Sequence, residues 1–138
     1  GAYRGLVSKT AALSPSPDAA LLDALRFGGG GAAAARAALE AGASVSCRDE
    51  SGAHPLHWAA LGGEREVLAL LLERRADVAA RQEDGRQPIH LAADGGSCRA
   101  IALLLDECAH VEAQEEDGGQ PIHWAAFGGH CDAVRLLL

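Results

Sequence analysis

The side chains of this 138-residue chain that are best suited to metal binding or nucleophilic catalysis are six histidines and four cysteines. Three of the histidines, His57, His90 and His123, lie 33 positions apart. Imidazole is a common zinc ligand, and a histidine can activate a cysteine, as His130 would have to activate its neighbour Cys131. The sequence therefore raises two chemical hypotheses, a metal site and a thiol-based active site, and both depend on how the chain places these residues.

The three evenly spaced histidines lie in three copies of one short block. The block reads His-Pro-Leu-His-Trp-Ala-Ala over 54–60, Gln-Pro-Ile-His-Leu-Ala-Ala over 87–93 and Gln-Pro-Ile-His-Trp-Ala-Ala over 120–126. A glycine upstream of each block keeps the same period, at Gly52, Gly85 and Gly118. A fixed period of about 33 residues indicates short structural units that stack on one another.

These blocks resemble the Thr-Pro-Leu-His-x-Ala motif of the ankyrin-repeat family. The resemblance implies an all-α fold, an ankyrin-repeat α-solenoid in which helix-turn-helix units stack and are joined by β-hairpin loops. We expect full repeats over 49–81 and 82–114 and a repeat truncated in its second helix over 115–138. Residues 18–48 lack the block and are expected to form a degenerate first repeat or N-terminal cap. Residues 1–17, which contain two Ser-Pro pairs, are expected to form a linker or N-terminal arm.

Each regular unit is predicted to contain two helices. The first begins at the proline of the block, where a missing N–H costs nothing, and a Gly-Gly pair turns the chain into the second. The second helix carries an apolar stripe that a single unit cannot bury. The stripe residues are Val67, Leu68, Leu71 and Leu72, then Ile101, Leu104 and Leu105, then Val134, Leu137 and Leu138. The capping threonine of the family motif is replaced by poorer caps, namely His54, Gln87 and Gln120.

The first unit is less regular than the others. Helices are predicted from Asp18 to about Phe27, capped by Ser16, and over the alanine-rich residues 32–40. Between them, Gly28 to Gly31 would make a turn two glycines longer than in the family. These glycines lack the Gly-x-x-x-x-Gly-Lys pattern and the preceding strand of a phosphate-binding loop, so we interpret them as a turn.

The ends of the second helices also depart from the family pattern. Arg75 and Cys108 stand where Gly42 follows the second helix of the first unit. A left-handed conformation there costs a non-glycine residue on the order of 1 kcal/mol, so we expect strain at both positions. Asp106 and Glu107 add unfavourable negative charge to the same helix end. The unit over 82–114 is therefore predicted to be the least stable.

The expected stacking of the units argues against both chemical hypotheses. Equivalent positions in neighbouring units are about 8–10 Å apart, whereas zinc needs ligand atoms about 2 Å from a shared ion, so the three histidines cannot converge on one metal. The resemblance implies instead that they bond to neighbouring backbone and join the loops. Cys98 and Cys131 are likewise too far apart for a disulfide, and adjacent helical residues such as His130 and Cys131 do not face each other. We expect no metal, no cofactor and no catalytic residue.

Composition narrows the class of partner. A net charge of −7 argues against nucleic acid and against an anionic membrane, because both need a basic surface. No apolar run approaches the ~20 residues that span a bilayer, and the cysteines show no Cys-x-x-Cys spacing. We therefore expect an intracellular protein, in the cytoplasm or alternatively the nucleus. We also predict that it is a monomer and not an enzyme.

The resemblance implies that a partner protein docks on the hairpin tips and on the outward side of the first helices. The three units differ most at these positions, which are rich in carboxylates, so we expect an acidic groove that binds a basic or mixed-charge protein segment. Trp58 and Trp124 share one position with Leu91 and are interpreted as packing residues, with a binding anchor as the alternative for a tryptophan that is partly exposed. The candidate partner-binding residues are Glu50, Ser51, Ala53, Leu61, Glu83, Asp84, Arg86, Asp94, Glu116, Asp117, Gly119 and Phe127.

The predicted function is non-catalytic protein–protein recognition, as a scaffold or adaptor. Two alternatives remain open. The chain could be the targeting or regulatory segment of a larger enzyme, such as a kinase, an acyltransferase or a ubiquitin-ligase component, or it could be a structural spacer. It contains no methionine and stops inside a predicted helix, so we expect that both ends are cut from a longer protein.

Overall fold

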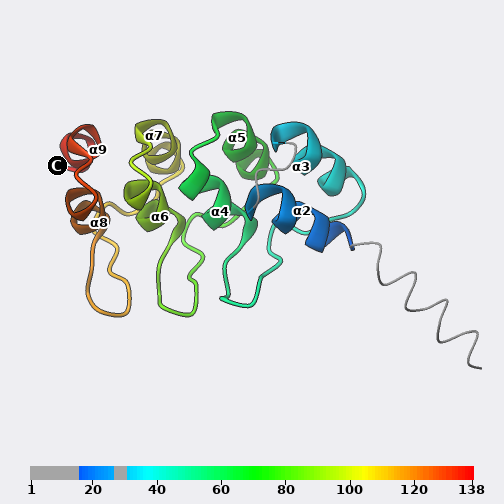
Figure 1. Cartoon of the computed structure of the whole chain (residues 1–138), viewed down its shortest axis with the longest axis horizontal. Helices are drawn as coiled ribbons and strands as arrows, with labels where there is room; N and C mark the ends of the chain where they lie inside the picture. The colour runs from blue at the N-terminus through cyan, green and yellow to red at the C-terminus, as the bar shows by residue number, and fades with distance from the viewer. Residues whose placement is uncertain (1–15, 27–30) are drawn as a thin grey trace, which may run out of the picture.

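Residues 16–26 and 31–138 are described by the computed structural model, and in these ranges the chain forms eight helices and no strand. The helices are α2 (Pro17–Arg26), α3 (Gly31–Glu40), α4 (Pro55–Gly62), α5 (Arg65–Glu73), α6 (Pro88–Asp94), α7 (Cys98–Asp106), α8 (Pro121–Phe127) and α9 (Cys131–Leu137). They form successive pairs that lie side by side (Figure 1). The predicted all-α stack is confirmed. Most of the expected arm and residues 28–30 of the predicted glycine turn lie outside the described residues, and Gly31 is the first residue of α3.

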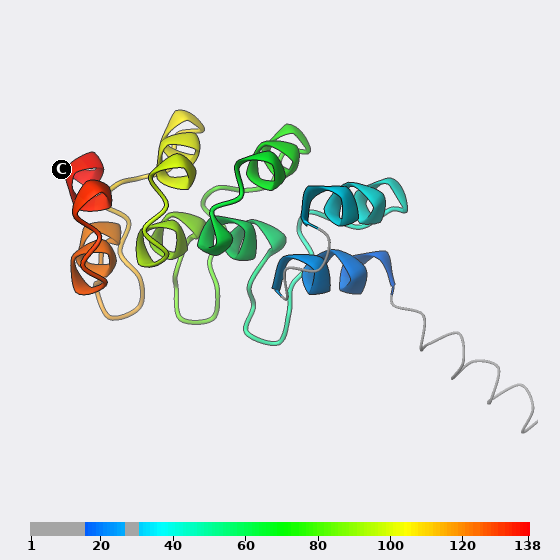
Figure 2. The same ribbon diagram turned by 45° about the horizontal axis from the view of Figure 1, so that its top comes forward.

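The helix pairs form two layers. The first helices α2, α4, α6 and α8 pack against one another in order, and so do the second helices α3, α5, α7 and α9. Figures 1 and 2 show the loops between units projecting from the side of the first helices. One side of the stack, which we call the loop side, therefore consists of loop tips and first helices.

The apolar core lies between neighbouring pairs. Leu56 of α4 and Ile89 of α6 are fully buried, and each such side chain stabilises the fold by about 1.5–3 kcal/mol. The predicted stripes are buried at Val67, Leu68, Leu71, Ile101, Leu104 and Leu137. Leu72, Leu105 and Val134 of the stripes are half-buried, and two further positions differ from the prediction. Leu70 is also buried, because α5 is covered by both α3 and α7, and Leu138, which follows α9, is 89% exposed.

The helices begin where the sequence predicts. Ser16 Oγ accepts a hydrogen bond from Ala19 N at 3.1 Å, and α2 begins at Pro17. Helices α4, α6 and α8 each begin at the proline of their block, and the preceding residues make no side-chain capping bond. In the second of these units the side-chain oxygen Oε1 of Gln87 is also buried without a partner. These starts therefore lack the bond that a threonine would supply.

The loops between units are bonded as hairpins but are too short to form strands. Each is closed at its base by one backbone bond, from Asp49 N to Ala53 O, from Gln82 N to Arg86 O and from Glu115 N to Gly119 O, at 2.9–3.0 Å. Adjacent loops are joined by bonds from Glu83 N to Ser51 O (3.2 Å) and from Glu116 N to Asp84 O (2.9 Å). A Cβ on Gly85 would lie 2.9 Å from Glu116 N, so glycine is required for this contact.

The expected strain after the second helices is present. Arg75 has a φ of 64° and Cys108 a φ of 69°, in the left-handed region, while Gly42 at the equivalent place has a φ of 106°. Cys108 is exposed, so its side chain contributes little packing that would offset the strain.

Replacing Cys108 with glycine is expected to raise the free energy of unfolding by about 0.5–1 kcal/mol. The left-handed conformation costs an L-residue about 1–2 kcal/mol, and the larger chain entropy of unfolded glycine cancels part of the gain. Urea denaturation measures the change. The control Cys108→Ala keeps the Cβ and the strain, so a glycine variant no more stable than the alanine variant would contradict this account.

Candidate functional site

The evenly spaced histidines bond to the backbone in two directions. In each block the ring Nδ1 accepts a hydrogen bond, at 2.9–3.0 Å, from the N–H three residues earlier. The proton therefore sits on Nε2, which donates across to the next unit. His57 donates to Arg86 O at 2.9 Å, and His90 donates to Ala113 O at 2.9 Å and to Gly119 O at 3.1 Å. The predicted structural role is confirmed for these two rings, and the described residues contain no cluster of three or more side chains that could hold a metal.

Burial keeps these two histidines neutral. Both are fully buried. Burial lowers the pKa of His57 to about 4, although the hydrogen bond to Arg86 O opposes the shift. The pKa of His90 is lowered for the same reason. Neutral rings are what the bonding requires, because a protonated Nδ1 could not accept the N–H of its own block.

The cysteines are not arranged as nucleophiles. All four are free thiols. Burial, with a smaller contribution from the negative charge of Asp18, raises the pKa of Cys47 to about 11, so this thiol stays protonated at neutral pH. His130 donates from Nε2 to Asp94 O at 2.9 Å. Its ring thus ties the start of α9 to the preceding unit, and it is not used to activate Cys131.

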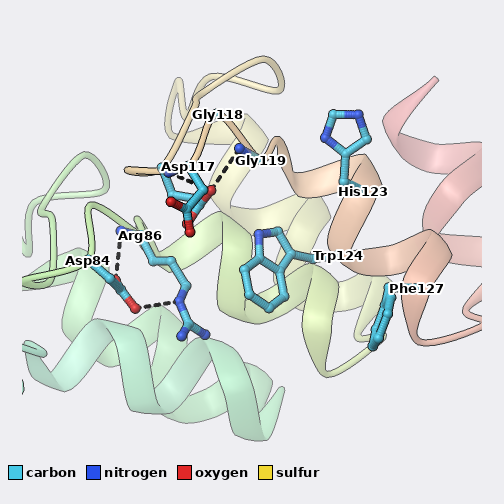
Figure 3. A pocket seen from close by; sticks show the side chains of 9 residues that line it. Asp84, Arg86, Asp117, Gly118, Gly119, His123, Trp124 and Phe127 are labelled. Carbon is cyan, nitrogen blue, oxygen red and sulfur yellow. Dashed lines mark hydrogen bonds and ion pairs between the residues drawn. The ribbon is translucent and has the colours of Figure 1, made fainter.

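A hollow of about 610 Å³ lies on the loop side, where the last loop meets α8 and the preceding loop (Figure 3). Figure 3 shows the ring of Trp124 between Arg86 on one side and Phe127 on the other. Phe127 is 93% exposed, and Trp124 is half-buried. The lining residues are Asp84, Arg86, Glu115, Asp117, Gly118, Gly119, His123, Trp124 and Phe127.

The charged side of the hollow is held by an ion pair. Arg86 Nε lies 2.7 Å from Asp84 Oδ2, and Asp84 also accepts the N–H of Arg86 at 3.1 Å. Partial burial opposes ionisation of Asp84, but these bonds and one from Gln82 lower its pKa overall. The guanidinium carbon lies 4.6 Å from the centroid of the Trp124 ring, within cation–π distance. The charge of Arg86 is therefore already matched by groups of the chain itself.

The hollow brings together five of the predicted partner-binding residues, Asp84, Arg86, Asp117, Gly119 and Phe127. Four others are exposed on loop tips outside it, Glu50, Ser51, Glu83 and Glu116, and two are half-buried on first helices, Leu61 and Asp94. The prediction for Ala53 is corrected, because this side chain is 0% exposed. It lies at the base of its loop, directly before the buried His54, where a partner cannot reach it.

Sequence reasoning missed four residues that line the hollow. These are Glu115, Gly118, His123 and Trp124. The sequence favours a structural role for His123 and a packing role over a binding role for Trp124, because their positions stay fixed or apolar in the other units. The signal that would have singled out Trp124 is the side-chain-free Gly119 beside it, where the other units have Ala53 and Arg86.

Comparison with known families agrees with this architecture. One family model, described as ankyrin repeats (many copies), matches residues 39–92, and another, described as ankyrin repeats (3 copies), matches residues 78–138. Together they cover residues 39–138. No curated protein matches the chain significantly. In the described part of the chain, no helix has the length and apolar character needed to cross a membrane.

Acid is expected to destabilise the fold between pH 6.5 and 5 through the buried histidines. The pKa of His57 is about 4 in the folded chain, compared with about 6.5 when unfolded. In this window the unfolded chain therefore binds a proton that the folded chain does not. The contribution of neutral His57 to the free energy of unfolding is fully present above about pH 6.5. It falls with decreasing pH, by up to about 1.4 kcal/mol per pH unit.

Denaturant titrations at several pH values measure this slope. His57→Gln is expected to reduce it, because glutamine does not titrate, while His90 still contributes. Equal slopes in the His57→Gln variant and the wild type would show that burial of this ring does not set the acid sensitivity.

Proposed function

The chain belongs to the ankyrin-repeat family, whose repeats are protein–protein interaction modules, and from this premise we propose that it is a non-catalytic scaffold or adaptor. A partner protein binds on the loop side of the stack. The same surface would serve a stand-alone adaptor or the targeting segment of a larger enzyme. The pairwise packing of α2 with α3, and of this pair against α4 and α5, supports the assignment of residues 18–48 as a degenerate first repeat.

The observation that carries the proposal is the hollow beside Trp124. It combines a concave surface with an aromatic side chain, Phe127, that is 93% exposed. Exposing a phenylalanine to water is unfavourable, and burying it against a partner recovers about 1.5–3 kcal/mol. Aromatic residues are also enriched where partner proteins bind. A contact site for a protein segment accounts for both features.

We propose that the partner segment is basic or of mixed charge. The chain carries a net charge of −7, and exposed carboxylates recur on the loop tips at Glu50, Glu83, Glu116 and Asp117. Charges of opposite sign on the partner would speed association and orient it along the row of loops. The same negative surface would repel nucleic acid, and we propose that the chain binds its partner as a monomer.

Reversing charge on the middle loop, with Glu83→Arg plus Asp84→Arg, is expected to weaken partner binding by about tenfold or more, because rim attraction becomes repulsion. Wild-type binding is expected to weaken with added salt. Affinity capture with the chain as bait supplies the partner, and titration at low and high salt measures both effects.

A matched control places the same charge change on the other layer of the stack. Asp106→Arg plus Glu107→Arg, at the end of α7, is expected to leave affinity within about twofold, because these residues lie on a second helix, in the other layer of the stack from the first helices of the loop side. An affinity that changes neither with added salt nor with the charge reversals at Glu83 and Asp84 would refute the acidic-surface proposal.

A further inference from the structure

The two tryptophans occupy equivalent positions but differ in hydrogen bonding. Trp58 Nε1 donates to Asp49 Oδ2 at 2.9 Å. Trp124 Nε1 has no acceptor within hydrogen-bonding distance in the described part of the chain. This nitrogen is not buried, because among the described side chains Gln87 Oε1 is the buried polar atom that lacks a partner. The indole N–H of Trp124 therefore reaches the hollow, and Figure 3 shows its nitrogen on the side of Gly119.

The difference arises from the residue nine positions earlier. Asp49 uses Oδ1 to accept the N–H groups of Ser51 and Ala53, at 2.9 and 3.0 Å, which leaves Oδ2 for the indole. At the equivalent position Glu115 uses Oε1 to accept the N–H groups of Asp117 and Gly119, at 3.0 and 2.7 Å. The longer side chain keeps the loop bonds but does not bring its second oxygen to Trp124.

Gly119 opens the space in front of the indole nitrogen. In the first regular unit this position is Ala53, whose methyl group is fully buried. A Cβ on Gly119 would lie 3.3 Å from Trp124 Nε1 and 2.8 Å from Glu115 Oε1. Two of the differences between the last unit and the first regular unit, aspartate to glutamate and alanine to glycine, therefore favour an accessible N–H donor.

The groups around this donor indicate what it binds. Phe127 offers an apolar surface, and Asp117 is an exposed carboxylate on the loop tip. Arg86 is already paired with Asp84, so the hollow offers an incoming acceptor an N–H rather than a free cation. An extended peptide meets all three features, because its main-chain carbonyl is a neutral acceptor and its side chains alternate in direction.

We infer that Trp124 anchors the main chain of the partner, with its indole N–H donating to a peptide carbonyl in an extended segment. An apolar side chain of that segment contacts Phe127, and a lysine or arginine lies near Asp117. This inference rests on the proposed function and adds to it the residue that fixes the register of the bound segment. Trp58, whose N–H is bonded to Asp49, has no such role.

NMR of the free protein, without a partner, can distinguish the two indole N–H groups. The chain contains two tryptophans, so its ¹⁵N–¹H spectrum has two indole signals, which Trp58→Phe and Trp124→Phe assign. The Trp124 indole proton is expected to exchange with water faster than that of Trp58. Glu115→Asp with Gly119→Ala recreates the arrangement of the first regular unit and is expected to slow this exchange, whereas Asp49→Glu is expected to speed exchange at Trp58.

The binding test uses a defined pool of synthetic twelve-residue peptides built from Ala, Gly, Leu, Phe, Lys and Arg with a positive net charge. The tightest-binding peptide serves as the probe, and its affinity is measured by calorimetry. Glu115→Asp plus Gly119→Ala is expected to weaken binding roughly three- to tenfold, as the loss of one hydrogen bond would do. The matched variant Asp49→Glu is expected to leave affinity unchanged. The probe is also expected to shift the Trp124 indole signal and not that of Trp58.

The outcomes separate this inference from the proposed function. If a peptide binds but Glu115→Asp plus Gly119→Ala leaves affinity unchanged and the Trp124 indole signal does not move, the inference is wrong while the proposed function stands. If no peptide of the pool binds, the inference is overturned, whereas the proposed function is decided by affinity capture with the whole chain as bait. A peptide with its central amides replaced by esters, which are weaker acceptors, is expected to bind more weakly than its amide form to the wild type and equally to the double variant.

Discussion

None of the helix pairs in the described ranges can bury its apolar residues alone. The second helices carry their apolar stripes on one side, and Leu68, Ile101 and Leu104 are fully buried only because another pair packs on them. This constraint explains the rest of the stack. It requires a constant distance between neighbouring units, and fully buried small residues of the first helices, such as Ala60 and Ala93, allow close packing. It also explains why the block around each proline and histidine recurs with a fixed period.

Hydrogen bonds of the histidines fix how neighbouring units are aligned. Each neutral ring accepts an N–H of its own block, and His57 and His90 also donate to a carbonyl of the next unit. Each of these two rings makes one hydrogen bond inside its own unit and one to the next unit. Adjacent units therefore cannot slide past each other without breaking a buried hydrogen bond. The same rigidity leaves side chains at the loop tips free to vary, because adjacent tips are joined through backbone atoms.

The sequence predicted the frame well and the binding surface less well. The helix starts at Pro55, Pro88 and Pro121 and the strained conformation of Cys108 follow from local chemistry, which recurs in every unit and can be read from one of them. The solvent exposure of Ala53 and of the Trp124 indole nitrogen could not be predicted in this way. Whether each side chain is covered depends on the length of one carboxylate and on the presence of one methyl group several residues away. Such differences are small in sequence and decide access only once the loop is folded.

Equivalent positions in the stack therefore need not have equivalent roles. Trp58 and Trp124 each lie beneath an arginine, Arg26 at 5.5 Å and Arg86 at 4.6 Å from the ring centroid. One tryptophan has its N–H bonded within its own unit, and the other presents that N–H in a hollow beside an exposed phenylalanine. A repeated frame thus provides several similar places, and exchange of one or two neighbouring residues makes one of them suited to a partner.

Native-state hydrogen exchange of an Ile89→Ala variant tests the mutual dependence of the helix pairs most directly. Ile89 is fully buried in α6, which packs against both α4 and α8. If the pairs stabilise one another, amide protection will fall in α4 and α8 as well as in α6 and α7. Loss of protection confined to α6 and α7, with α4 and α8 unchanged, would contradict a stack in which each pair depends on its neighbours.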